Sequence, residues 1–260
     1  MPIILTTDQQ NAITKIGEFI SRDDKIFLLK GSAGTGKTTI IRIITQILKE
    51  KEISHTLMAP TGKAAKVISE RTGEEARTIH SAIYSFDKLS EVKDFSTTKE
   101  DDDATPLYCF KLKDCPGSQI IIVDEASMIG NAYSDSGILR FGSGYLLDDL
   151  INYSGVCRDD ISSKIIFVGD PFQLSPIGSN HSVALDADWL EESFEVGVCE
   201  GELLTPVRFG ENSGILENAT LLRDRLVSGV IGNIKFAENS NCSFIPRTES
   251  ITNCYLDTLN

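Results

Sequence analysis

The sequence has no hydrophobic run long enough to cross a membrane as a helix. Its first residues, Met1 to Thr6, lack the charged and apolar regions of a signal peptide. Six cysteines are scattered without a C-x-x-C pair, which favours reduced thiols over a disulfide framework. We therefore expect a cytoplasmic protein with no membrane partner. Its 260 residues, 41% of them hydrophobic, are enough for one large domain or for one domain plus a small insert.

Positive charge is also scarce, since 25 Lys and Arg face 38 Asp and Glu and leave a net charge of −13. Such a balance argues against a general polyanion binder. The stretch 25–80 differs, because its ten basic and five acidic residues give +5 and leave −18 for the rest. A nucleic-acid surface, if present, should be built from this stretch. On charge alone, solvated helix faces are the simpler interpretation.

The most informative motif is the segment Gly31 to Thr38, which matches the P-loop pattern G-x-x-x-x-G-K-[ST]. A short apolar run at 26–30 predicts a buried strand before it, and 39–48 predicts a buried helix after it. Glycines let successive N–H groups cradle phosphate oxygens at a helix N-terminus. Lys37 can reach the β- and γ-phosphates, and the Thr38 hydroxyl can hold Mg²⁺. The predicted nucleotide-binding residues are Gly31, Ser32, Ala33, Gly34, Thr35, Gly36, Lys37, Thr38 and Thr39.

A second polar signal is the acidic pair Asp124 and Glu125, which follows a β-branched run at 119–123. The carboxyl end of a parallel strand is where such sheets bind ligands. Asp124 would hold Mg²⁺, and Glu125 would orient and deprotonate an attacking water. An ordinary helix-capping acidic turn is the alternative interpretation.

Two further candidates are weaker on the residues alone. Gln173 follows a predicted strand at 164–168 and could sense a γ-phosphate through its amide, or belong to a polar turn. Arg208 lies near a turn and could meet the charge that develops in phosphoryl transfer, although on the residue alone a surface role is the simpler interpretation. Strands separated by helices predict a parallel sheet covered on both faces. The change of composition at 84–118 predicts an inserted hairpin or small subdomain.

Taken in order, these segments resemble the N-terminal motor domain of superfamily 1 helicases, in the branch of RecD, TraA and Dda. Residues 5–9 resemble the Q motif, 31–38 motif I, and 124–128 motif II. Between them, 59–65 and 78–81 resemble motifs Ia and Ib; 169–174 and then 208–215 resemble motifs III and IV. The resemblance covers about residues 5–225, and the order of the motifs is more specific than any one of them.

This resemblance implies an α/β P-loop NTPase with a RecA-like parallel sheet, helices on both faces and a small inserted β-hairpin subdomain. It implies ATP and Mg²⁺ as cofactors, with Gln9 reading adenine and Lys37, Asp124, Glu125, Gln173 and Arg208 serving catalysis. It also implies single-stranded DNA, or a junction of duplex and single strand, as the partner. The implied DNA contacts are Pro60, Thr61, Lys63, Thr78 and His80.

The implied domains are a RecA-like ATPase domain at 1–83 and 119–235 and a pin subdomain at 84–118. Residues 236–260 would begin a truncated second RecA-like domain, so we expect only weak activity from this chain alone. The family branch also implies 5′-to-3′ movement by the whole motor. We expect no requirement for an oligomer. One departure is Ser175, where the family usually has proline. A P-loop kinase for a small molecule and a nucleotide-dependent protein switch remain the alternative functions.

Overall fold

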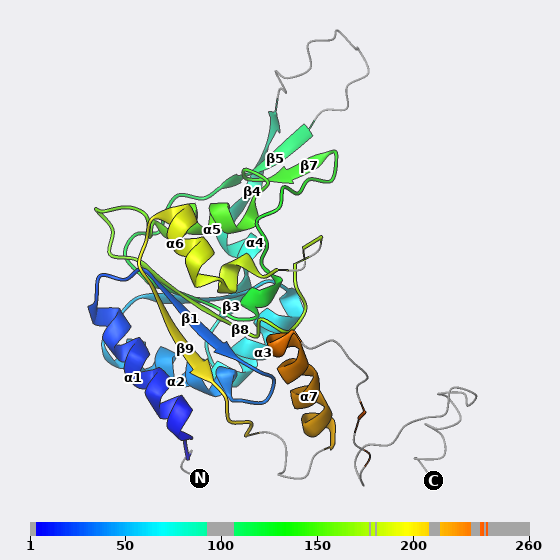
Figure 1. Ribbon diagram of the computed structural model, residues 1–260. Helices are drawn as coiled ribbons and strands as arrows, with labels where there is room; N and C mark the ends of the chain where they lie inside the picture. Colours follow the sequence, from blue (N-terminus) through cyan, green and yellow to red (C-terminus); the bar gives the residue numbers. More distant parts are fainter. Residues whose placement is uncertain are drawn as a thin grey trace, which may run out of the picture. The chain divides into compact units, whose positions relative to one another are not determined.

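The computed structural model describes residues 4–92, 107–176, 178–179, 181–207, 214–229, 235–236 and 238 (Figure 1). The chain divides into two units, residues 1–206 and 207–260, and the first contains almost all of the described secondary structure. No described helix is both long enough and apolar enough to pass through a membrane.

The first unit is built on a six-stranded sheet in which every described strand pair is parallel. The strands are β1 (Ile26–Gly31), β2 (His55–Ala59), β3 (Ala76–Thr78), β6 (Ile120–Val123), β8 (Lys164–Gly169) and β9 (Val198–Leu203). Their order is β3-β2-β6-β8-β1-β9, so β1 lies between β8 and β9. All residues of β6 and β8 are buried, as expected for central strands covered on both faces. This architecture confirms the predicted fold class.

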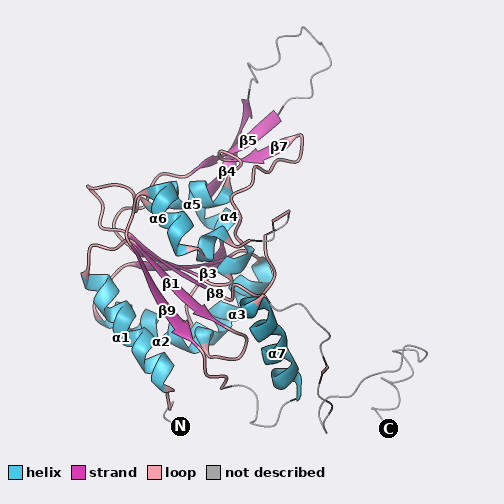
Figure 2. Ribbon diagram, viewed as in Figure 1, coloured by secondary structure: helices cyan, strands magenta, loops and turns pink. Residues whose placement is uncertain are grey.

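Helices cover both faces of the sheet (Figure 2). One face packs against α1 (Thr7–Ser21), α2 (Lys37–Glu50) and α3 (Gly62–Thr72). The other packs against α4 (Ile79–Ile83), α5 (Leu146–Ser154) and α6 (Ala187–Phe194). Alternate residues of β1 serve the two cores: Phe27 and Leu29 contact the α1–α2 side, whereas Ile26 and Leu28 contact the α5–α6 side. Two short 3-10 helices, η1 (Ala126–Met128) and η2 (Val183–Leu185), lie in the loops.

A second, three-stranded sheet contains the predicted hairpin. Strands β4 (Tyr84–Val92) and β5 (Leu107–Leu112) pair antiparallel, with residues 93–106 between them outside the described part. The sequence did not predict the third strand, β7 (Leu139–Phe141), which follows η1 in the chain and pairs parallel with β5. The small sheet is tied to α5 by the buried Tyr84 hydroxyl, which donates to Asp149 Oδ2 at 2.7 Å.

In the second unit the structure describes α7 (Gly214–Ser228). Arg208 lies outside the described residues, and so do all of residues 236–260 except 236 and 238. The predicted role of Arg208 and the predicted second domain therefore stay predictions.

Candidate nucleotide-binding site

The P-loop connects β1 to α2, in the order that the sequence predicted. Gly34 (φ 84°) and Gly36 (φ 90°) adopt the left-handed backbone conformation that favours glycine. Gly36 is the N-cap of α2, and its carbonyl accepts the N–H groups of Thr39 (2.9 Å) and Ile40 (3.1 Å). The loop therefore ends at a helix N-terminus, where free N–H groups and the helix dipole favour an anion such as a phosphate.

Gly31 begins the loop in a space that admits no side chain. A Cβ atom there would lie 2.8 Å from Thr35 Oγ1 and 2.9 Å from Leu203 Cβ. Gly31 also pairs with Leu203 in the ladder between β1 and β9. The start of the P-loop is thus packed directly against the end of the edge strand.

The P-loop lysine already lies across the loop. Lys37 Nζ donates to the carbonyl oxygens of Gly31 (2.7 Å) and Ser32 (3.2 Å). This arrangement holds an ammonium group at the loop, where the phosphates of a nucleotide would replace carbonyls as its partners.

The acidic pair lies at the carboxyl end of β6, two strands from β1 in the sheet. Asp124 is 8% exposed, and its N–H donates to Met58 O at 2.9 Å. Burial and the neighbouring charge of Glu125 raise the pKa of Asp124 to about 6, although Lys37 partly offsets them. Because β1, β8 and β6 are parallel, the P-loop and the acidic pair both follow the carboxyl ends of strands at one edge of the sheet. Glu125 has a left-handed backbone (φ 54°, ψ 38°), a strain that the surrounding structure must impose.

The end of β8 lies against η1, which directly follows the acidic pair. A Cβ at Gly169 would lie 3.1 Å from Ser127 N and 3.3 Å from Ala126 N, so the two strand ends approach closely. Beyond it, Asp170 Oδ1 accepts the N–H of Phe172 (3.1 Å), and Gln173 Nε2 donates to Asp170 Oδ2 (3.4 Å). The sequence predicted Gln173 as a γ-phosphate sensor. The structure places it in a turn closed by Asp170, just after β8, the strand that neighbours β1.

Gln9 lies at the P-loop in a way that the sequence did not predict. Its side chain is 2% exposed, and its Nε2 donates to Thr35 O at 2.9 Å. Its Oε1 accepts the N–H of Thr6 at 3.1 Å, which completes a capping box at the start of α1. The predicted contact with adenine is not tested by these bonds. The bond between Thr6 N and Gln9 Oε1 could have been predicted from the sequence, because Thr6 and Gln9 have the T-x-x-Q spacing of a capping box.

The residues predicted to contact DNA lie at or just after the carboxyl ends of β2 and β3, at the same edge of the parallel sheet as the P-loop. Thr61 caps α3 by accepting the N–H of Ala64 (3.2 Å), and Thr78 caps α4 by accepting that of Ser81 (3.2 Å). Lys63 is exposed in the first turn of α3, and Pro60 is partly buried just before it.

His80 occupies a different environment from these residues. Its ring lies 5.0 Å from that of Phe141 and 5.7 Å from that of Tyr84, beside the small sheet. Burial lowers the pKa of His80, which favours a neutral ring. The structure describes all five residues predicted to contact DNA, and their role in DNA binding stays a prediction.

A divalent cation would have few protein ligands here. No group of three His, Cys, Asp or Glu in the described ranges could hold a metal by itself. The predicted ligands, the Thr38 hydroxyl and the Asp124 carboxylate, are oxygen donors of the kind that Mg²⁺ prefers. Mg²⁺ commonly takes one or two carboxylates and completes its shell with phosphate and water, so this donor set fits a nucleotide-bound Mg²⁺.

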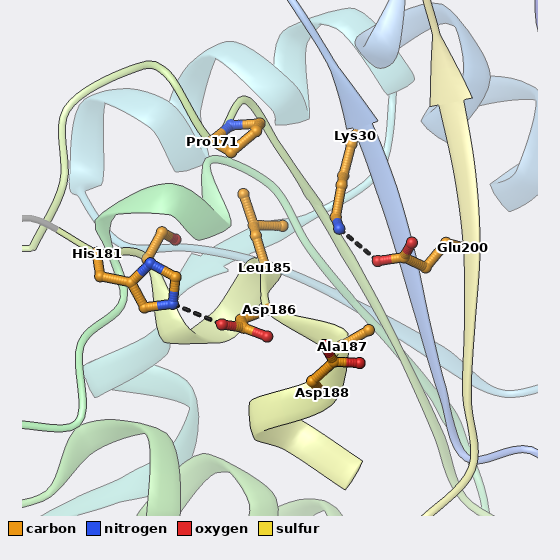
Figure 3. A pocket seen from close by; sticks show the side chains of 9 residues that line it. Lys30, Pro171, His181, Leu185, Asp186, Ala187, Asp188 and Glu200 are labelled. Carbon is orange, nitrogen blue, oxygen red and sulfur yellow. Dashed lines mark hydrogen bonds and ion pairs between the residues drawn. The ribbon is translucent and has the colours of Figure 1, made fainter. Parts of the chain in front are cut away.

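One cavity lies on the opposite face of β1 from α2, beside η2 and the start of α6 (Figure 3). Its volume is about 370 Å³, and Lys30, the residue before the P-loop, lines it. Lys30 is paired with Glu200, and His181 Nε2 lies 2.6 Å from Asp186 Oδ2. Because Lys30 and Asp186 already have these partners within the cavity, we assign it no ligand.

Together, the parallel sheet, the P-loop and the acidic strand end define a P-loop NTPase domain of the RecA-like class. Residues 4–136 match the AAA domain family, and the chain belongs to it. The family match and the likeness to the helicase relatives below confirm the predicted resemblance to a RecA-like motor domain of the superfamily 1 helicase type.

Named relatives support this assignment. The chain is 33% identical over 128 residues to the ATP-dependent DNA helicase dda of Enterobacteria phage T4, covering 48% of this chain and 26% of that protein. It is 25% identical over 201 residues to the RecBCD enzyme subunit RecD of Buchnera aphidicola, covering 74% of this chain and 30% of that protein.

A solved structure of Pif1 helicases acting at forked double-stranded DNA matches with a TM-score of 0.50 and 19% identity, over 86% of this chain and 48% of that chain. At this identity the match shows the fold. The chain spans about a third or less of the length of the curated relatives it matches.

Proposed function

We propose that this chain binds and hydrolyses ATP with Mg²⁺ as one motor domain of a 5′-to-3′ DNA helicase. One observation carries the proposal: β1, β8 and β6 run parallel, so the P-loop after β1 and the acidic pair after β6 lie at the same edge of the sheet. In this proposal Lys37 and the loop N–H groups bind the phosphates, and Thr38 and Asp124 hold Mg²⁺. The bound Mg²⁺ would neutralise phosphate charge as the reaction proceeds.

The proposed catalytic base is Glu125, which orients and deprotonates the attacking water. Gln173 and Arg208 are proposed to respond to the γ-phosphate, and Gln9 to contact adenine. A second RecA-like domain in the same polypeptide would supply the remaining catalytic groups. The proposed DNA-binding surface includes Pro60, Thr61, Lys63, Thr78 and His80, and the proposed substrate is single-stranded DNA at or near a duplex junction.

Lys63 offers a direct test of the DNA-binding part of the proposal. Fluorescence anisotropy with a labelled oligo(dT) should show binding to the 260-residue chain that weakens steadily as salt rises, because phosphate contacts release counterions. Lys63→Ala should weaken binding by about threefold to tenfold and reduce the salt slope by about one. The matched control is Lys51→Ala, since Lys51 is also exposed but follows the carboxyl end of α2, away from the P-loop.

The outcomes separate the candidate functions. If the wild-type chain binds an ATP analogue but no single-stranded DNA at low salt, the helicase proposal fails and a kinase or a protein switch is favoured. If Lys51→Ala weakens binding as much as Lys63→Ala does, the proposed surface is wrong. If single-stranded DNA binds and also stimulates ATP hydrolysis, the kinase and switch alternatives are rejected.

A further inference from the structure

The N-terminus of α1 contacts two segments that are far apart in the sequence. Gln9 Nε2 donates to Thr35 O in the P-loop at 2.9 Å. The adjacent residue, Asp8, accepts two consecutive N–H groups after β9: its Oδ2 lies 2.7 Å from Leu204 N and 2.9 Å from Thr205 N. Neighbouring side chains of one helical turn thus bind the P-loop and the exit of the edge strand.

The charge on Asp8 is well stabilised in this position. Burial would raise the pKa of Asp8, but the N–H of Thr205, the Thr6 hydroxyl and the N–H of Leu204 outweigh it and lower this pKa to about 2. A carboxylate that accepts several hydrogen bonds is held firmly in its charged form. Asp8 also lies in the first turn of α1, where the helix dipole favours a negative charge.

Other contacts also connect α1, the P-loop and β9 to one another. Gly31, at the start of the P-loop, pairs with Leu203 at the end of β9. Further along α1, Lys15 Nζ donates to Glu200 O at 3.1 Å. The edge strand β9 is therefore bonded to α1 both within the strand and just after its end, and it pairs with β1 along its length. Leu204 and Thr205, which bind Asp8, come directly before Pro206, the last residue of the first unit.

We propose that Asp8 is a positioning residue that links nucleotide binding at the P-loop to the segment leaving β9, which leads into residues 207–260. The proposal rests on the proposed binding of ATP by this P-loop. Because phosphate binding must fix the backbone around Thr35, and Gln9 binds Thr35 O, the first turn of α1 is held more firmly when nucleotide is bound. Asp8 then passes that restraint to the N–H groups of Leu204 and Thr205.

Hydrogen exchange of the Leu204 and Thr205 amides, with and without an ATP analogue and Mg²⁺, measures this link directly. In the wild-type chain we expect the analogue to slow exchange at these two amides by at least about threefold, since local opening sets the rate. Asp8→Asn keeps the shape of the side chain but removes its charge. It should speed their exchange at least about tenfold, abolish the response to the analogue, and weaken analogue binding about threefold.

Two further variants make the result specific. Asp188→Asn is the matched control, because Asp188 also lies in the first turn of a helix, α6, and should leave exchange and binding unchanged. Thr205→Pro removes one of the two donors from the opposite side of the contact. The Leu204 amide remains as the reporter, and its exchange should lose the response to the analogue even if Asp8→Asn does not fold.

Each outcome has a distinct meaning. If the wild-type chain binds no ATP analogue, the proposed function and this inference both fail. If it binds the analogue but Asp8→Asn retains the wild-type exchange response, only the inference fails. If Asp8→Asn speeds exchange while affinity and the nucleotide response stay at wild-type values, Asp8 is merely structural and the link is refuted.

Discussion

Gly31→Ala tests whether the P-loop depends on the close packing of its first residue against β9. The added methyl group would lie 2.8 Å from Thr35 Oγ1, 2.9 Å from Leu203 Cβ and 3.1 Å from Leu203 O. The last of these atoms belongs to a backbone paired with β1, so it cannot move without disturbing the ladder. We expect a loss of about 1–3 kcal/mol in the free energy of unfolding, the usual cost of overpacking.

The same substitution should also displace the loop from its phosphate-binding geometry. A shift that costs about 1.4 kcal/mol in binding lowers affinity tenfold, and we expect at least this loss for an ATP analogue with Mg²⁺. Urea unfolding followed by circular dichroism measures the first effect, and titration with a fluorescent ATP analogue measures the second.

Gly17→Ala is the matched control for this prediction. Gly17 is exposed within α1, and a Cβ there would meet no atom within 4 Å. Replacing an exposed helical glycine with alanine should stabilise the chain by about 0.5–1 kcal/mol and leave nucleotide binding unchanged. The packing argument is refuted if Gly31→Ala unfolds at the wild-type urea midpoint and binds the analogue with wild-type affinity.

The other predictions concern catalysis, stability and pH. Lys37→Ala should reduce affinity for an ATP analogue at least about a hundredfold with no change in circular dichroism, since it removes the main phosphate cation; unchanged affinity would contradict the P-loop assignment. Glu125→Gln should bind the analogue normally but slow ATP turnover at least about a hundredfold, and normal turnover would place the base elsewhere. Tyr84→Phe removes one donor to the buried Asp149, which keeps the N–H of Ser143, and should lower the free energy of unfolding by about 1 kcal/mol, as measured by urea unfolding; no loss would show that the bond is dispensable. The pKa of Asp8 falls from 3.8 to about 2 on folding, so its contribution of about 1 kcal/mol, reduced by solvent screening, is present above pH 4 and lost as pH falls through 2. The difference in stability between wild type and Asp8→Asn should therefore disappear over that range, and a constant difference would refute the role of its charge.

The sequence predicted the central elements well because their signals are local. The runs at 26–29 and 120–123 are continuous and apolar, as strands buried on both faces require. The glycines of the P-loop motif predict a loop with left-handed backbone positions, and Gly34 and Gly36 have them. In contrast, β9 was missed, since an edge strand that alternates charged and small residues at 198–203 has no strong hydrophobic pattern. The three-residue β7 is too short to leave a periodic signal.

What the sequence determined by itself is the class of the protein, because phosphate binding and the buried strands need particular residues at fixed short spacings. Only the tertiary structure decided how Asp8, Gln9 and Gly31 are used. Asp8 meets Thr205, 197 positions away in the chain, and Gln9 meets Thr35, 26 positions away. Bonds of this kind depend on which helix and strand the fold places side by side, and no local pattern records that placement.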